Sequence, residues 1–118
     1  MYGRVFIVSS DFRDAVRRGE LIAHKGCAVT MATSAANACE LLSSEPFEVV
    51  VAERAVSDLQ TIVSKCKTRN CTLLLINEPN GNASVQPYNG PIYVSEKDLV
   101  SRVEHAIEER HVQACCSR

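Results

Sequence analysis

The sequence lacks the features that would mark a membrane or nucleic-acid protein. It contains no tryptophan, only 5% aromatic residues, and no apolar run near the ~20 residues of a membrane-spanning helix. Residues 1–4 lead straight into a short apolar run, without the long apolar stretch and cleavage site of a signal peptide. Thirteen Lys and Arg stand against fourteen Asp and Glu, so no excess of positive charge attracts nucleic acid or anionic lipid. We therefore expect a cytoplasmic domain that contacts neither membrane nor nucleic acid.

Metal-ligand spacing is also missing. There are six cysteines but no Cys-x-x-Cys pair, and none of the three histidines is spaced with a cysteine as a metal ligand. We predict no metal and no other cofactor. Cytosolic thiols stay reduced, so a disulfide framework is not expected either. Four cysteines in or beside apolar segments are predicted to be largely buried, and two in a polar tail exposed: Cys27, Cys39, Cys66 and Cys71, then Cys115 and Cys116.

Motifs of nucleotide binding and of nucleophilic catalysis are absent as well. The segment VSSDFRDA, where a phosphate-binding loop would follow the first strand, contains no glycine. No G-x-S-x-G elbow occurs, Cys39 and Cys66 fall within predicted helices, and the histidines lie away from predicted strand ends. We therefore expect a protein that is not an enzyme.

What the sequence does contain is an alternation of strand and helix patterns. Its 118 residues, 46% of them hydrophobic, suffice for one domain. The predicted strands are Arg4–Val8, Cys27–Ala32, Phe47–Ala52, Cys71–Ile76 and Pro91–Val94. The predicted helices are Phe12–His24, Ala35–Ser43, one opened by a capping box at Ser57–Gln60 and reaching about Thr68, and Asp98–Arg110. This order predicts a doubly wound, flavodoxin-like α/β fold with a five-stranded parallel sheet in the order 2-1-3-4-5. The domain is expected over residues 1–112, with 113–118 as a flexible tail or the start of a linker.

One connection is unusual. Residues 77–90 read NEPNGNASVQPYNG, with two prolines, two glycines and four asparagines. These residues favour turns over helix, so at most a short helical turn around residues 82–86 is expected. The helix that normally covers such a crossover is therefore predicted to be missing or remodelled, leaving Leu74, Ile76 and Ile92 less shielded.

Polar side chains follow the predicted strands at the edge where doubly wound sheets place their sites. These residues are Ser9, Ser10 and Asp11, then Glu53 and Arg54, then Asn77 and Glu78, and finally Ser95, Glu96 and Lys97.

The chain from about Arg4 to Arg110 resembles the receiver domain of two-component response regulators. The resemblance rests on the order of elements, the size, and the segments RVFIVSSD, FEVVVAE and GPIYV. It implies an acidic pair for magnesium after the first strand, a phosphoacceptor Asp after the third, a Thr or Ser after the fourth and a Lys after the fifth. The matching positions here are Ser9 and Ser10 with Asp11 next in line, Glu53, Asn77, and Glu96 with Lys97 one place later.

These departures predict a degenerate receiver, or pseudoreceiver, that works without phosphorylation. Mg²⁺ prefers carboxylate ligands, and two serines replace the acidic pair. If Glu96 faces the pocket, a phosphoryl dianion meets an added negative charge instead of an ammonium group. A plainer interpretation pairs Glu53 with Arg54 or Lys97 at a solvated rim.

The resemblance also implies a partner surface formed by the fourth helix, fifth strand and fifth helix of the family. The partner would be a protein or an effector domain, as expected for the regulatory part of a larger response regulator or transcriptional regulator; homodimerisation is a further possibility. Tyr93 matches the family's aromatic switch position. The surface residues are Asn82, Tyr88, Ile92, Tyr93, Val94 and Arg102.

Two alternatives stay open at this point. One is a flavodoxin-like domain for a small ligand or cofactor, with residues 77–90 as a lid; the length of that segment is its support. The other is an active but unusual phosphoacceptor.

Overall fold

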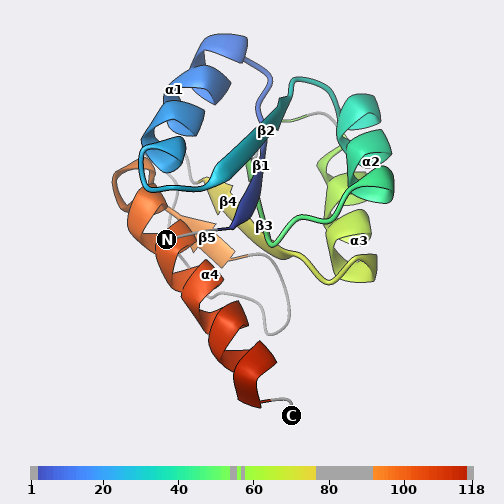
Figure 1. Ribbon diagram of the computed structural model, residues 1–118. Coiled ribbons are helices and arrows are strands. Elements are labelled where there is room, and N and C mark those ends of the chain that lie inside the picture. Colours follow the sequence, from blue (N-terminus) through green and yellow to red (C-terminus); the bar gives the residue numbers. More distant parts are fainter. Residues whose placement is uncertain (1–2, 54–55, 57, 77–91, 117–118) are drawn as a thin grey trace.

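The computed structural model of the chain describes residues 3–53, 56, 58–76 and 92–116, with side chains up to residue 111. Its centre is a five-stranded parallel sheet in the order β2-β1-β3-β4-β5 (Figure 1). The strands are β1 Arg4–Val8, β2 Ala28–Ala32, β3 Val49–Glu53, β4 Thr72–Ile76 and β5 Ile92–Val94. The predicted fold class and strand order are confirmed.

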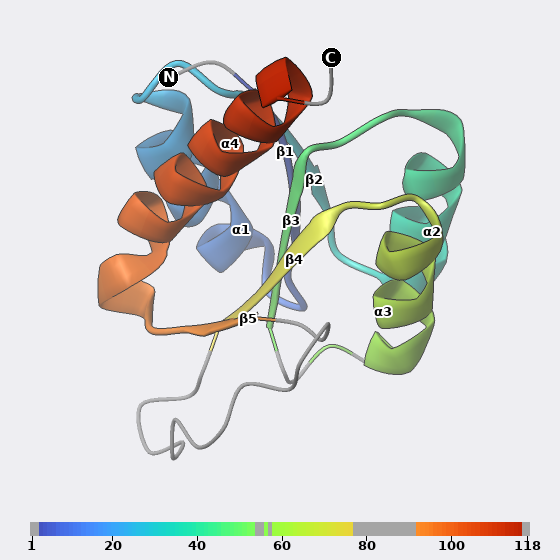
Figure 2. The ribbon, with the colours of Figure 1, turned by 90° about the horizontal axis from the view of Figure 1, so that it is seen from below.

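Helices cover both faces of this sheet. Figure 2 shows α1 and α4 on one face and α2 and α3 on the other. The helices are α1 Phe12–Ala23, α2 Ala35–Ser44, α3 Leu59–Thr68 and α4 Leu99–Cys116, and a 3-10 turn, Glu96–Asp98, leads into α4. None of the helices in the described ranges has the length and apolar character needed to cross a membrane.

The sheet separates two apolar clusters because successive side chains of a strand point to opposite faces. Val5, Ile7, Val49 and Val51 lie with the inner residues of α1 and α4. Phe6, Val8, Val50, Ala52 and their neighbours lie with α2 and α3. The strands β1 and β3 have almost no exposed side chain, which explains why their sequences are continuous apolar runs.

This alternation corrects the expectation about shielding beside residues 77–90. Leu74 is 1% exposed and Ile76 6% exposed, in the cluster beneath α1 and α4. Ile92 is partly buried against the same cluster. The three residues share one face of the sheet, which α1 and α4 already cover. The residues on the opposite face are Leu73, Leu75 and Tyr93.

Polar side chains cap the starts of α1, α2 and the 3-10 turn. The side chains of Asp11 and Ser34 accept hydrogen bonds from the N–H groups of Arg13 and Asn37, at 2.8 and 3.3 Å. Ser95 likewise accepts from the N–H of Asp98 at 3.3 Å. The predicted capping box at Ser57–Gln60 is wrong, because the residue before α3 is Asp58, with φ 57° and no side-chain cap bond.

The last helix is longer than predicted. It ends at Cys116 and not at Arg110, so residues 113–116 continue α4 where a flexible tail was expected. Nothing between 111 and 116 is a glycine or proline, so no residue of that segment interrupts helical hydrogen bonding. The domain boundary at residue 112 stays a prediction. The predicted remodelling of residues 77–90 lies outside the described residues.

Candidate functional site

The carboxyl ends of the central strands converge on one buried arginine of α1. Arg18 is 7% exposed, although its neighbour Arg17 is exposed. Its guanidinium group lies between two carboxylates, Glu53 at the end of β3 and Glu96 after β5. Two elements of the sheet edge are thereby connected to α1 through a single side chain.

All three nitrogen atoms of the Arg18 guanidinium group have a carboxylate partner. Its Nε donates to both carboxylate oxygens of Glu96 at 3.1 Å, and its Nη2 lies 3.0 Å from Glu96 Oε2. Its Nη1 forms an ion pair with Glu53 Oε1, which also accepts a hydrogen bond from the hydroxyl group of Ser9. Ser9 is fully buried, and its Oγ accepts the N–H of Asp11 at 3.3 Å.

Charge is balanced within this cluster. Burial lowers the pKa of Arg18, but its hydrogen bonds to Glu96 and Glu53 outweigh that effect and leave the pKa raised overall. Arg17 adds a second cation from the solvent side, with Nη2 2.8 Å from Glu96 Oε1 and 3.2 Å from Asp14. Glu96 is therefore compensated by two arginines, and Arg18 stays charged between two carboxylates.

The structure brings three of the predicted pocket residues together: Ser9, Glu53 and Glu96. Glu96, two residues after β5, is the one that pairs with Arg18, although 38% of its side chain is exposed; Lys97 is exposed as well. The interpretation that pairs Glu53 with Lys97 is wrong, because the partner of Glu53 is Arg18.

The remaining predicted positions take other places. Ser10 is exposed, and Asp11 caps α1 at its exposed start. Asn77 and Arg54 lie outside the described residues. Across the described part of the chain, no group of three or more His, Cys, Asp or Glu side chains is arranged to hold a metal ion.

Sequence reasoning missed Arg18, yet a signal for it existed. The buried face of α1 carries Ala15, Gly19 and Ile22, and position 18 falls on that same face at helical spacing. A charged residue on the apolar face of an amphipathic helix requires a buried partner of opposite charge. The sequence offered such partners in the acidic residues already placed at the sheet edge.

The predicted partner surface is described only in part. Arg102 is exposed on α4, and Tyr93 is partly buried against the cluster beneath α2 and α3. Ile92 is partly buried on the other face. Val94 is 3% exposed beneath α4, so it packs in the core and does not line a surface. Asn82 and Tyr88 lie outside the described residues.

Comparison with known proteins identifies the fold. No family model and no curated protein matches the chain. Among solved structures, a CheY-like receiver domain protein from Methanospirillum hungatei is 15% identical, with TM-score 0.79 over 96% of this chain and 99% of its own. The Francisella response regulator 1452 receiver domain is 17% identical, with TM-score 0.74 over 92% and 98%. NtrX from Brucella abortus is 14% identical, with TM-score 0.83 over 99% of this chain but 29% of its own. The chain thus has the receiver fold.

Proposed function

We propose that this chain is a pseudoreceiver, which takes part in signal transduction by binding a protein partner without phosphorylation and without catalysing a reaction. The observation that carries the proposal is the ion-pair cluster of Arg18, Glu53 and Glu96. It occupies the strand ends where, by the resemblance, a phosphorylatable receiver holds its magnesium ion and phosphoryl group.

The chemistry of the cluster supports this proposal in three ways. A phosphoryl group on Glu53 would introduce a dianion beside Glu96, and like charges ~4 Å apart repel by about 4 kcal/mol per unit pair at an effective dielectric constant near 20. Ser9 and Ser10 supply hydroxyl groups where Mg²⁺ would need carboxylates. Removing Arg18 from its partners would also leave buried charge uncompensated, at a cost of roughly 3–5 kcal/mol.

The partner surface belongs to the same proposal. In the receiver fold, β5 and the start of α4 form an edge that lies beside the carboxyl ends of the strands (Figure 2). Ile92, Tyr93 and the exposed Arg102 would contact an effector domain or a second copy of the chain. The NtrX chain extends well beyond the matched part, which is an example of a receiver-like segment within a longer protein.

The experiment is sedimentation of the chain with and without acetyl phosphate and Mg²⁺. We expect self-association that is the same in both conditions and is weakened by Tyr93→Glu. Met31→Glu is the matched control, because Met31 is 38% exposed on the opposite edge strand. Circular dichroism verifies that each variant folds. Association that changes with acetyl phosphate would contradict phosphorylation independence. Equal weakening of self-association by Tyr93→Glu and Met31→Glu would contradict the proposed location of the partner surface.

A small-ligand domain with residues 77–90 as its lid is the second candidate from the sequence. Its lid lies outside the described residues, and no feature of the described site favours it. Cytoplasmic location likewise stays a prediction.

A further inference from the structure

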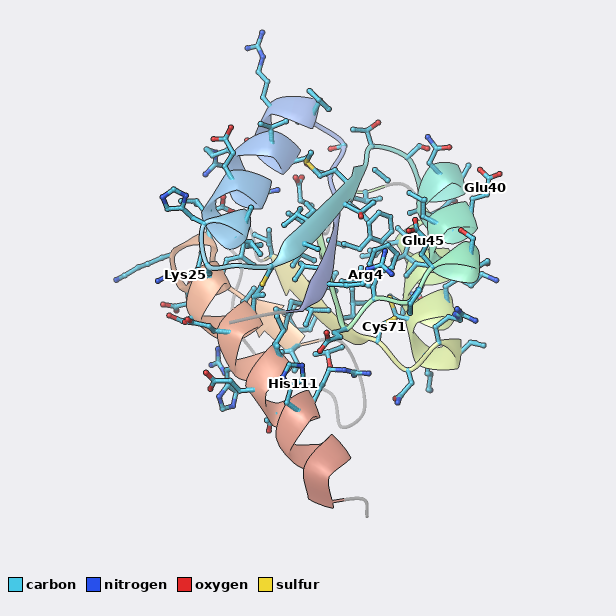
Figure 3. All side chains as sticks on the ribbon, in the orientation of Figure 1. Arg4, Lys25, Glu40, Glu45, Cys71 and His111 are labelled. Atoms are coloured by element: carbon cyan, nitrogen blue, oxygen red, sulfur yellow. The ribbon has the colours of Figure 1, made fainter. Side chains whose placement is uncertain are left out.

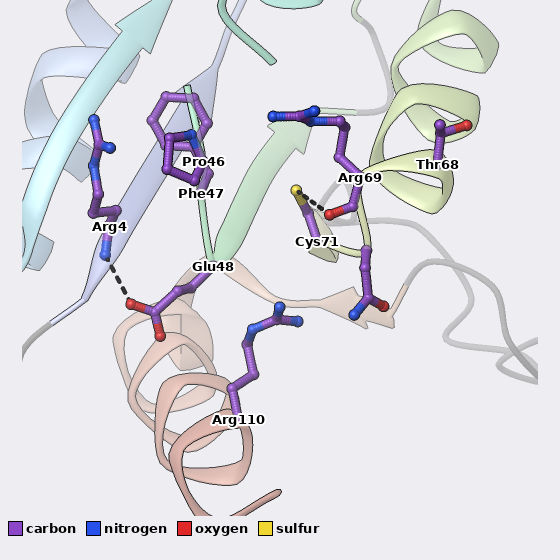
Figure 4. Close-up of a pocket in the computed structure, with 9 residues that line it drawn as sticks. Arg4, Pro46, Phe47, Glu48, Thr68, Arg69, Cys71 and Arg110 are labelled. Carbon is purple, nitrogen blue, oxygen red and sulfur yellow. Dashed lines mark hydrogen bonds between the residues drawn. The ribbon is translucent and has the colours of Figure 1, made fainter. Parts of the chain in front are cut away.

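A second cluster of functional groups lies at the opposite end of the sheet, where the strands begin. A pocket of about 500 Å³ opens there between the end of α3, the start of β4 and the side of α4. Three arginines line it, Arg4, Arg69 and Arg110, with Glu48 and the thiol of Cys71 (Figure 4). Figure 3 shows Arg4 and Cys71 at this same end of the molecule. The cluster of Arg18 plays no part in it.

Local backbone structure places a second thiol against Cys71. Helix α3 ends in a Schellman motif, in which Asn70 has φ 58° and donates to the carbonyl of Lys67 at 3.3 Å. The N–H of Cys71 closes the motif on the carbonyl of Cys66 at 2.9 Å. Side chains at the two closing positions of this motif frequently contact each other, and here both are cysteines. Cys71 packs against the apolar cluster that contains Cys66.

The two thiols differ in exposure and in charge. Cys66 is 2% exposed and Cys71 is partly exposed at the pocket. Interaction with the Cys66 thiol lowers the pKa of Cys71 to about 7 despite its burial. The positive charges of Arg110 and Arg69 and the backbone N–H of Phe47 act in the same direction. The Cys71 Sγ also lies 4.0 Å from the carbonyl oxygen of Arg69.

The pKa of the partner thiol, Cys66, shifts in the opposite direction. The hydrogen bond to Cys71 and burial both raise the pKa of Cys66. The pair therefore holds one partly exposed cysteine with a lowered pKa and one buried cysteine with a raised pKa. Cys71 suits the first attack because it forms the thiolate more readily, whereas Cys66 has to lose its proton when it attacks the oxidised Cys71. Glu48 and Arg4 also line the pocket. Because the Arg4 guanidinium group is paired with Glu45 at 2.9 Å, Arg69 and Arg110 are the cations that act on Cys71.

We propose that Cys66 and Cys71 form a reversible dithiol–disulfide site that responds to hydroperoxides, with Cys71 attacking and Cys66 resolving. The Cys71 thiolate attacks the hydroxyl oxygen of the hydroperoxide and the O–O bond breaks. The leaving group is hydroxide from hydrogen peroxide or alkoxide from an organic hydroperoxide, and it takes a proton to give water or an alcohol. Cys71 becomes a sulfenic acid. The Cys66 sulfur then attacks the Cys71 sulfur and loses its proton, the S–O bond breaks, and water leaves. The two thiols lose two electrons and the peroxide gains them.

The bridge would be easy to reduce again. It closes a loop with four intervening residues, so it constrains the unfolded chain little and gains little stability from that source. Both thiols are free in this structure, which is the reduced state of the site. This inference does not depend on the proposed partner binding.

The test is treatment of the full chain with hydrogen peroxide, in a Cys115→Ser, Cys116→Ser background that removes the tail thiols. Trypsin cleaves after Lys65, Lys67 and Arg69, which separates Cys66 from Cys71. We expect a non-reduced peptide in which residues 66–67 are joined to residues 70–97, about 2 Da lighter than the sum of its parts. Reduction by dithiothreitol should release both peptides.

Variants distinguish the roles of the thiols. Cys66→Ala should leave Cys71 as a sulfenic acid that dimedone labels, and Cys71→Ala should leave Cys66 unmodified. Cys39→Ala is the matched control and should keep the 66–71 link, although Cys39 on α2 is close enough to raise the pKa of Cys66. A link from Cys39 to either thiol, no link at peroxide concentrations that oxidise free cysteine, or dimedone labelling of Cys66 first would overturn the proposal. Circular dichroism confirms folding before oxidation.

Discussion

The two ends of the parallel sheet use arginine in opposite ways. At the carboxyl end, Arg18 lies buried between Glu53 and Glu96 and has its donors directed at carboxylates. We call this arrangement closed because each of these charged groups has a partner of opposite charge. A new anion would have to displace one of the two carboxylates from Arg18. The resemblance to receiver domains predicts a phosphoacceptor pocket at this end of the sheet. In the structure the Arg18 side chain lies there.

At the amino end, arginines surround a pocket that stays open. Glu48 lines it together with Arg4, Arg69 and Arg110. Arg4 is paired with Glu45, whereas the positive charges of Arg69 and Arg110 lower the pKa of Cys71. Arg18 neutralises two carboxylates at one end of the sheet, whereas Arg69 and Arg110 at the other end lower the pKa of a thiol. Which of these happens depends on the neighbours that the strand ends supply.

The largest effect is expected from removing the closed ion pair. Arg18→Ala leaves Glu53 and Glu96 without their shared cation, so the free energy of unfolding should fall by about 3 kcal/mol. Urea denaturation followed by circular dichroism measures it. Arg17→Ala is the matched control on the same helix; Arg17 is exposed, so its loss should change stability by less than about 0.5 kcal/mol. An equal loss in the free energy of unfolding for the two variants would show that the buried ion pairs of Arg18 contribute no more to stability than the exposed ones of Arg17.

The next effect concerns the open pocket. Alkylation requires the thiolate, so the rate at Cys71 should rise with pH and level off above about 7, where its pKa lies. Cys66→Ala removes the hydrogen bond that lowers this pKa, so the inflection should move toward the ordinary value near ~8.5 and the rate at pH 7 should fall about tenfold. Iodoacetamide labelling with peptide mass analysis gives both profiles. Identical profiles would mean that Cys66 does not act on Cys71.

A smaller effect is expected at the turn that joins the two thiols. Asn70 has φ 58°, which an alanine side chain adopts at a cost of about 1 kcal/mol. Asn70→Ala should lower stability by that amount and slow formation of the 66–71 disulfide, whereas Asn70→Gly should preserve both. Thermal unfolding and the oxidation assay measure the two effects. If Asn70→Ala kept both its stability and its rate of disulfide formation, the conformation of this turn would not control the reaction of Cys66 with Cys71.

The fold was predictable from the sequence, whereas the site was predictable only in part. Continuous apolar runs such as residues 71–76 and helical spacing such as Leu99, Val103 and Ile107 identify buried elements, and their alternation determines the sheet order. The same reasoning placed Ser9, Glu53 and Glu96 at one edge. It did not find Arg18. The helical spacing of α1 places this residue on the buried face, but its partners lie 35 and 78 residues away in the chain, and no local pattern identifies them.

The sequence also does not predict which side chains become neighbours when backbone geometry determines it. Cys66 and Cys71 are each ordinary apolar residues in their own segments, and only the Schellman motif between them makes a thiol pair. The left-handed residues Asp58 and Asn70 follow from turn geometry that composition indicates weakly. Val94 was assigned to the partner surface by the resemblance, which does not tell which side chains of the fifth strand face the core; Val94 is 3% exposed and lies in the cluster beneath α1 and α4.

The central claim, that the carboxyl-end pocket is closed to phosphoryl chemistry, is tested most directly by amide NMR spectra of ¹⁵N-labelled protein with Mg²⁺ and beryllofluoride. The account predicts no saturable change at residues 9–11, 53 or 96 in the wild type. A variant that restores the expected groups, Ser9→Asp, Ser10→Asp, Glu53→Asp and Glu96→Lys, serves as the positive control. A Mg²⁺-dependent, saturable shift at Glu53 in the wild type, with a millimolar or tighter midpoint, would contradict the account.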